Sequence, residues 1–259
     1  MTTALMKTCL LGMAGVMTIG LAACGDDSSS TSSTNATSAS VSASANAGSA
    51  STSANPTYQQ SAGLKRLSTD DVTNAISENK INNQTFTVVN SSQISDQTDQ
   101  VLKSMDQAKV SPAKCGDIIK NATSGITDSE LNNTVSALGG DQSSPVALTF
   151  ITSMSDRLKK SYETENEQFS QCGKVTMELQ GHKTEMTMKM SPVKGYESVA
   201  KRAGLSTTVS SSDGGPEITL HQAYVWLNND QLIQTSSLNA KTAQTTLASA
   251  VEALGISKK

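Results

Sequence analysis

The N-terminal apolar run limits what this chain can fold into, because it decides where the folded part begins. The run extends from Thr8 to Ala23 and follows a single cation, Lys7. A charged start, an apolar centre of about 7–15 residues and small residues before a cut are typical of a secretory signal. A membrane-spanning helix needs about 20 apolar residues, whereas this run is shorter and contains several Gly and Thr residues. Residues 1–23 are therefore predicted to be a leader that is removed.

The residues at the end of the leader predict a lipid anchor. Ala22 and Ala23 stand directly before Cys24, and this arrangement resembles a bacterial lipobox, in which the cysteine sulfur is joined to a diacylglyceryl group before the leader is cut off. Stable anchoring takes more than one acyl chain, which a diacylated or triacylated Cys24 would supply. The protein would then face the extracytoplasmic side of the cell membrane. The alternative is an ordinary cleaved signal without lipid, because such sites also use small residues.

The segment after Cys24 is predicted to be a disordered tether. From Ser28 to Asn55 the chain uses only Ser, Thr, Ala, Asn, Gly and Val. Such a segment has too little apolar surface to offset the loss of chain entropy on folding. As a flexible coil it would span roughly 30–35 Å. We expect residues 24–62 to be the lipidated cysteine and tether, with glycosylation left open, and residues 63–259 to form a single domain.

The cysteine count predicts one disulfide. Of the four cysteines, Cys9 lies in the leader and Cys24 carries the lipid, which leaves Cys115 and Cys172. In an exported chain an even pair favours a disulfide, and closing so long a loop contributes about 4 kcal/mol in the chain-entropy model. A metal-binding thiol pair is the weaker alternative, because there is no Cys-x-x-Cys spacing.

Hydrophobic periodicity predicts an α+β domain. Helices are expected at 68–79, 95–108, 112–124, 155–172 and 239–254. Strands are expected at 85–89, 133–138, 146–151, 175–179, 186–190, 218–227 and 232–235, with turns at 139–141 and 181–183, a short helix or loop at 195–203 and a break at 210–216. The strands come mostly in hairpins, so we expect an antiparallel sheet of about five to six strands with helices packed mainly on one face.

No motif in the chain indicates catalysis, a metal or a cofactor. The phosphate-binding glycine loop, the His-Glu-x-x-His helix and the Gly-x-Ser-x-Gly elbow are absent from the sequence. His182 falls in an expected turn, and His221 stands in a strand without a sequence partner. A net charge of −3 with 17% charged residues argues against a nucleic-acid partner. We therefore predict a protein that is not an enzyme.

The candidate ligand-binding residues come from two expected strands. Met186, Met188 and Met190 alternate along one strand, and Tyr224 and Trp226 alternate along another. Methionine is flexible and polarizable and recurs at adaptable binding surfaces, and aromatic residues often line pockets. The alternative is that the methionines belong to the core and that the two aromatic residues pack under the C-terminal helix.

Several short motifs resemble a known family. They are Pro112–Cys115, Gln168–Cys172, the alternating strand that follows, and Tyr224–Asp230 before a last amphipathic helix. Together they are similar to the extracellular sensor-type domains of actinobacteria, which occur on mycobacterial receptor serine/threonine kinases and on lipoproteins. The resemblance implies a small antiparallel sheet with helices, a cleft, a Cys115–Cys172 bridge and ligand binding rather than catalysis.

The sequence thus predicts a lipid-anchored extracytoplasmic protein with a non-catalytic, ligand-binding or sensor-like domain that binds something in the cell wall or the medium. Its partners would be the membrane, through Cys24, and an unidentified small molecule or envelope protein. One alternative is a scaffold lipoprotein that docks an envelope protein through an exposed apolar patch. Another is a carrier for lipid or lipoglycan, which would require a large dry cavity.

Overall fold

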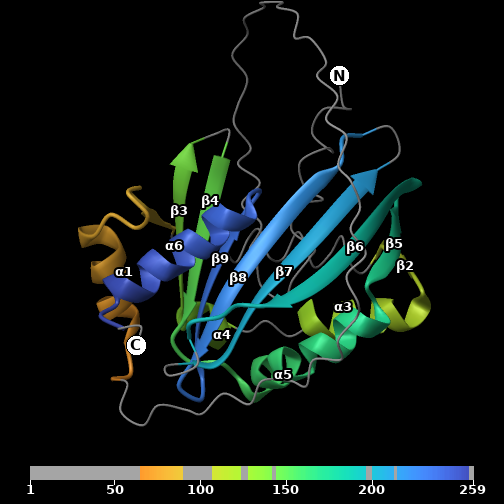
Figure 1. Ribbon diagram of the computed structural model, residues 1–259. Helices are drawn as coiled ribbons and strands as arrows, with labels where there is room; N and C mark the ends of the chain where they lie inside the picture. Colours follow the sequence, from red (N-terminus) through yellow and green to blue (C-terminus); the bar gives the residue numbers. More distant parts are fainter. Residues whose placement is uncertain are drawn as a thin grey trace, which may run out of the picture. The chain divides into compact units, whose positions relative to one another are not determined.

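The computed structural model describes residues 65–89, 107–123, 128–141, 144–196, 200–212 and 215–256 (Figure 1). The predicted leader, the lipid site Cys24 and the tether lie outside the described residues, as does most of the helix expected at 95–108. Within the described part of the chain, no helix has both the length and the hydrophobicity needed to cross a membrane.

The core of the fold is one antiparallel sheet with the strand order β1-β3-β4-β9-β8-β7-β6-β5-β2. The nine strands are β1 (Thr87–Val89), β2 (Lys109–Ser111), β3 (Thr134–Asp141), β4 (Ser144–Ile151), β5 (Lys174–Leu179), β6 (His182–Pro192), β7 (Ala200–Ser212), β8 (Ile218–Leu227) and β9 (Gln231–Ser237). The α+β class is confirmed, whereas the expected five to six strands were too few. The strand β9 connects β1, β3 and β4 with the remaining strands, because it pairs with β4 on one side and with β8 on the other.

The largest error in the predicted strand set is β7, where the sequence suggested a short helix or loop and then a break. Its residues are mostly Ser, Thr, Ala and Gly, so apolar alternation is weak. The strand pairs with β6 from Gly204 to Ser212 and with β8 from Ala200 to Ser210. Backbone pairing on both sides therefore defines this strand more than its side chains do. The expected turn at 139–141 is also part of a strand, β3.

The helices are α1 (Thr69–Glu78), α3 (Ala113–Thr123), α4 (Asp128–Asn132), α5 (Asp156–Gln171) and α6 (Ala240–Ala253). Three of the helices, α1, α5 and α6, begin at the expected positions directly after a capping residue, whereas α4 was not expected. The side chain of Ser68 accepts a hydrogen bond from the backbone of Asp71 in a capping box, and Ser155 and Asn239 cap α5 and α6 in the same way. Each cap satisfies a backbone N–H that the first helical turn leaves without a partner.

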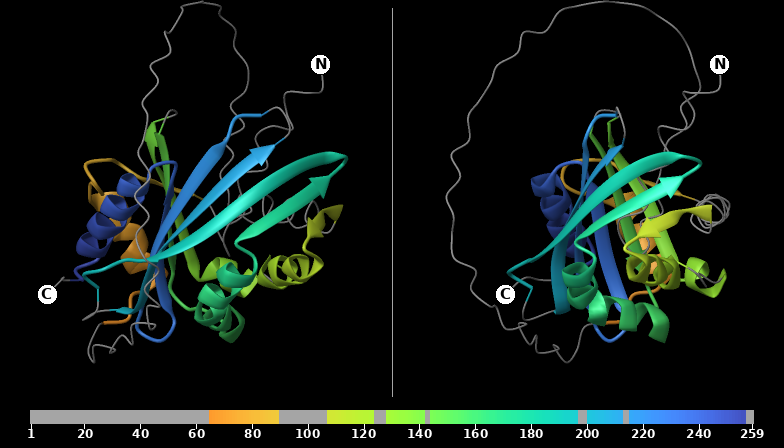
Figure 2. Two further views of the ribbon diagram at one scale, coloured as in Figure 1. Left: turned by 45° about the vertical axis from the view of Figure 1, so that its right-hand side comes forward. Right: turned by 90° about the vertical axis from the view of Figure 1, so that its right-hand side faces the viewer.

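Helices lie on both faces of the sheet, contrary to the expectation that they cover mainly one. Successive residues of β8 point to opposite faces, and Val225 belongs to the core cluster that contains Leu247 of α6. Its neighbours Tyr224 and Trp226 belong to a different cluster, with Leu158 of α5. Figure 2 shows α6 and α5 on different sides of the strands. We call these sides the α6 face and the α5 face.

The α6 face carries the larger apolar core. Side chains of α1 and α6 pack there on the central strands, as in the contact of Val72 and Leu247 with the cluster around Phe150. A cavity of about 10 Å³ remains between α1, α6 and the sheet, lined by apolar residues that include Ile76, Leu148 and Ala250. This volume is at the lower limit for one water molecule, so this cavity is not a ligand site.

Candidate functional site

All five predicted ligand-binding residues point to the α5 face. Met186, Met188 and Met190 come from β6, and the register across β7 puts them on the same side as Tyr224 and Trp226 of β8. Gly204 of β7 brings the two groups into contact, because a Cβ atom there would lie 2.2 Å from Met190 Cε and 2.8 Å from Tyr224 Cε1. The missing side chain leaves the space in which Met190 and Tyr224 approach each other.

These five residues are divided between two packed clusters. Met186 is buried with Val175 and Met177 beside the disulfide, and Met188 is partly buried against the same group. Tyr224 and Trp226 are buried under α5, not under the C-terminal helix, and Met190 is partly buried against them. Ligand binding by these side chains stays a prediction. The structure adds that Met188 and Met190 remain partly accessible.

Neutral polar side chains cross the same face in two rows, which the sequence analysis missed. The strand register aligns the first row across β3, β4 and β9 and the second across β9, β8 and β7. We call them the polar rows, made of Ser136, Thr149 and Gln234, and of Ser236, Gln222 and Ser206. All six are between 3% and 8% exposed. Buried polar atoms are costly unless they form hydrogen bonds, so each of them needs a partner.

The polar rows do not use all their hydrogen-bonding capacity. Gln234 Oε1 accepts a hydrogen bond from the hydroxyl of Tyr162, with 2.9 Å between the oxygens. Ser206 Oγ donates to Gln222 Oε1 over 3.3 Å. The hydroxyl of Ser136 is buried, yet none of the residues that the structure describes gives it a partner. Such a hydroxyl offers one donor and two acceptor lone pairs on the α5 face.

Polar contacts also hold the middle of α5 against the sheet. The hydroxyl of Tyr224 donates to Glu165 Oε2 over 2.6 Å, and the guanidinium of Arg202 donates to the backbone oxygens of Tyr162 and Glu163. Lys201 Nζ lies 3.0 Å from Glu163 Oε1. The strand pairing of β7 shifts between Ala200 and Arg202. A bulge of this kind changes the direction of neighbouring side chains. The consecutive residues Lys201 and Arg202 therefore both contact α5.

Burial sets the protonation of this cluster. It raises the pKa of Glu165 to about 7, while the hydrogen bond from Tyr224 and the charge of Arg202 oppose the shift. Burial also raises the pKa of Tyr162 and of Tyr224 well above the ordinary value for tyrosine. Both phenols are therefore neutral hydrogen-bond donors near neutral pH. The side chains on this face can bind and orient polar groups.

The two histidines lie away from this site. His221 is on the α6 face, with its Nδ1 3.0 Å from the hydroxyl of Thr207, and burial lowers its pKa. His182 is the first residue of β6, and not part of the turn as expected. The turn itself is formed by Gln180 and Gly181, both with positive φ, as a tight hairpin requires. Among the described residues, no three His, Cys, Asp or Glu side chains gather into a metal-binding group.

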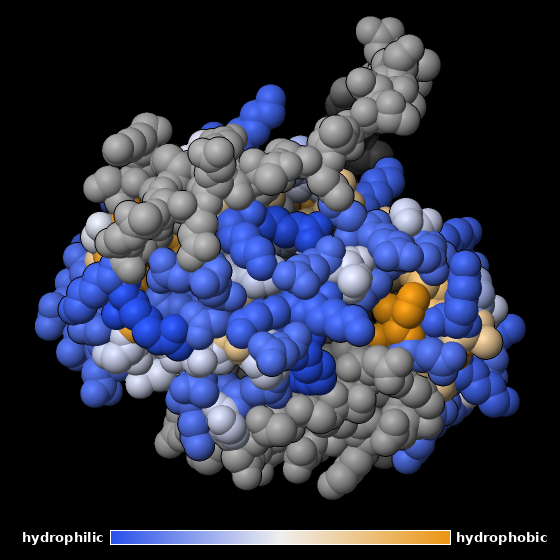
Figure 3. All heavy atoms as spheres, turned by 90° about the horizontal axis from the view of Figure 1, so that it is seen from below, coloured by the Kyte–Doolittle hydropathy of each residue, from blue (hydrophilic) through white to orange (hydrophobic). Residues whose placement is uncertain are grey.

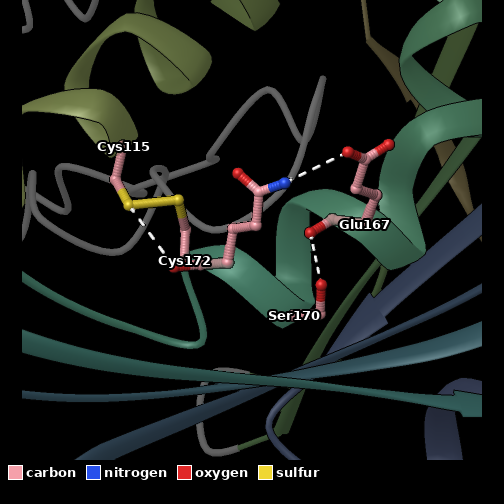
Figure 4. The surroundings of a disulfide bond; sticks show 5 residues. Cys115, Glu167, Ser170 and Cys172 are labelled. Atoms are coloured by element: carbon pink, nitrogen blue, oxygen red, sulfur yellow. Dashed lines mark hydrogen bonds between the residues drawn. A yellow bond between two sulfur atoms is a disulfide. The ribbon is translucent and has the colours of Figure 1, made fainter.

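The predicted disulfide is confirmed. Cys115 of α3 and Cys172 at the end of α5 are bonded, with 5.7 Å between their Cα atoms (Figure 4). Both are buried in the cluster that includes Met186. The last turn of α5 is reinforced by a hydrogen bond from Gln171 Nε2 to Glu167 Oε1 over 3.1 Å. The bridge therefore fixes the C-terminal end of α5 on the α5 face.

The described surface is mainly polar on the side seen from below in Figure 1. The side of the molecule seen in Figure 3 is largely hydrophilic, and its most hydrophobic residues gather in one small patch. Among the residues that the structure describes, Leu238 is the large hydrophobic side chain that is exposed. A docking site for another protein usually needs an apolar patch of a few hundred Å², and the scaffold alternative stays a prediction.

Sequence reasoning could have found part of this site. Glu165 follows Leu158 and Tyr162 on the inward stripe of α5, and an acidic residue at such a position signals a partly buried carboxyl group. Gln222 and Gln234 gave no such signal. Their alignment depends on which strands pair, and in which register.

Comparisons with protein-family models, with curated proteins and with solved structures found no match.

Proposed function

We propose that this chain is a lipid-anchored extracytoplasmic protein whose domain binds a small ligand on the α5 face without transforming it. Cys24 would carry the lipid. The polar rows would supply hydrogen bonds to the ligand, and Met188 and Met190 would supply an adaptable apolar border.

The residues around Cys24 and the disulfide support the proposed location. The leader with Ala22 and Ala23 before Cys24 has the pattern of a lipidation site. The bond between Cys115 and Cys172 is of the kind that forms and persists in oxidising, extracytoplasmic compartments. An exported domain and its bridge are therefore mutually consistent.

The observation that carries the binding proposal is the set of neutral polar side chains in the polar rows. A sheet face that served only as core would present mostly apolar residues, as the α6 face does over most of its area, although Thr235 and Ser237 are also buried there. Here amides and hydroxyls are buried side by side, and Ser136 Oγ has no described partner. A few placed polar groups bordered by apolar side chains are typical of small-molecule sites.

Native mass spectrometry tests the binding proposal. The mature protein would be isolated in detergent from a bacterial envelope and weighed under native and denaturing conditions. We expect a small-molecule adduct that disappears on denaturation and is reduced in Ser136→Ala. The matched control is Ser191→Ala, which removes an exposed hydroxyl from the α6 face. No adduct would refute the proposal and favour a protein partner, and an adduct of lipid mass would favour the carrier.

The mass of the mature N-terminus tests the anchor. Wild-type protein should begin at Cys24, gain the mass of a diacylglyceryl group and fractionate with membranes. Cys24→Ala should lack that mass. An unmodified wild-type Cys24 would support an ordinary cleaved signal instead.

A further inference from the structure

The helix α5 has unusually little apolar contact with the sheet for its length. It spans Asp156–Gln171, yet its buried side chains are only Leu158 and Tyr162, both in the N-terminal half. Its C-terminal end is held by the disulfide of Cys172 with Cys115. Most surface helices dock through a continuous apolar stripe. The middle of α5 depends instead on polar contacts.

Those contacts form a compact group that we call the polar latch. From α5 it includes Tyr162, Glu163 and Glu165. From the sheet it includes Lys201 and Arg202 of β7, Tyr224 of β8 and Gln234 of β9. Tyr162 and Tyr224 also pack edge to face, with 5.1 Å between their ring centroids.

Among the described residues of the latch, Glu165 is the carboxyl group without an ion-paired cation. The guanidinium of Arg202 is directed at the backbone oxygens of Tyr162 and Glu163. Lys201 is paired with Glu163 and lies over the ring of Trp226. In the part of the chain that the structure describes, no Lys or Arg forms an ion pair with Glu165, whose hydrogen-bond donor is the hydroxyl of Tyr224. An ionised carboxylate in this position would be incompletely compensated.

We propose that α5 is a proton-controlled strap over the α5 face, held closed when Glu165 is neutral and loosened when Glu165 gives up its proton to solvent. The neutral carboxyl group accepts the hydrogen bond from Tyr224 and carries no charge into the packed interface. Loosening would uncover the Tyr224–Trp226 cluster and the edge of the polar rows beside Gln234. The inference concerns the docking of α5 and holds whether or not the face binds a ligand.

The titration of Glu165 supports the direction of the effect. Burial raises its pKa from 4.5 to about 7, so the docked state holds the proton more tightly than the undocked state. Docking is therefore strongest below the ordinary carboxyl pKa and weakens as pH rises through about 7. With these two pKa values, the docking equilibrium falls on the order of 30-fold between pH 5.5 and 8.5.

Hydrogen exchange on the mature protein with its disulfide intact tests the strap. Amide protection of α5 would be followed from pH 5.5 to 8.5, corrected for intrinsic exchange, with α6 as the internal reference. Protection of α5 relative to α6 should fall on the order of 30-fold in the wild type. It should fall equally in Glu167→Gln, the matched control at an exposed carboxylate of α5 that lies outside the latch and keeps an oxygen acceptor for Gln171. It should be nearly constant with pH in Glu165→Gln, which retains an acceptor for Tyr224 but has no proton to lose.

Two results would overturn the proposal. One is equal loss of α5 protection in Glu165→Gln and in the wild type, and the other is protection in the wild type that does not change with pH. If Glu165→Gln does not fold, the test is the ¹³C chemical shift of the Glu165 side-chain carboxyl group in the wild type, followed as a function of pH. The strap requires this carboxyl group to titrate near neutral pH. A carboxyl group that titrates near 4.5 would exclude it. No ligand is needed in any of these measurements, so failure of the strap is distinguishable from failure of the proposed binding.

Discussion

Removing the disulfide should cost this domain a large part of its stability. The bond between Cys115 and Cys172 joins residues 57 positions apart. In the chain-entropy model, a loop of that length lowers the entropy of the unfolded chain enough to stabilise the fold by about 4 kcal/mol. Typical domains have about 5–15 kcal/mol in total. The double variant Cys115→Ala/Cys172→Ala is therefore expected to be close to the limit of folding.

Alanine is the better replacement because both cysteines are buried, at 0% and 3% exposure. Serine would leave unpaired hydroxyl groups in an apolar cluster, which costs an additional ~1–3 kcal/mol for each group. The alanine variant isolates the effect of the cross-link more cleanly, with only a small cavity added beside Met186.

The assay is urea unfolding of the mature protein, followed by the fluorescence of its single tryptophan. Trp226 is fully buried under α5, so its emission reports the interface that the disulfide fixes. We expect the free energy of unfolding to fall by about 4 kcal/mol. Wild-type protein in reductant should behave like the variant, and unreduced wild type should weigh two hydrogens less than its reduced form. A loss below about 1 kcal/mol, with the bridge verified by mass, would refute the entropic argument.

Three further substitutions have expected outcomes in the same unfolding assay. Gly204→Ala should destabilise the domain by about 1–3 kcal/mol through overpacking, because its new Cβ would lie 2.8 Å from Cε1 of the buried Tyr224 ring as well as 2.2 Å from Met190 Cε. No loss of stability would mean that both contacts relax freely. Ser136→Ala should stabilise it by about 1 kcal/mol, since a buried hydroxyl without a described partner is removed; a loss of stability would reveal a partner. Tyr162→Phe should lower the free energy of unfolding by about 1–3 kcal/mol, because it leaves Gln234 Oε1 unpaired. An unchanged urea midpoint would show that water replaces the phenol hydroxyl.

The features that the sequence predicted correctly are those set by neighbouring residues. The start of α5 follows from Ser155 and that of α6 from Asn239, because a cap bonds to backbone groups only three residues away. The hairpin of β5 and β6 follows from apolar alternation on both sides of Gly181. The pairing of Cys115 with Cys172 followed from counting the cysteines that remain once Cys9 is assigned to the predicted leader and Cys24 to the predicted lipid site.

The tertiary structure decided which residues meet across strands and between layers. β7 exists because β6 and β8 complete its backbone hydrogen bonds, although its own Ser- and Thr-rich sequence is a weak strand signal. Alternation placed Tyr224 and Trp226 on one face of β8, but it could not show which helix covers that face. The polar rows and the environment of Glu165 depend on strand register and helix docking. These are long-range contacts, and a local pattern contains no information about the partner that lies across them.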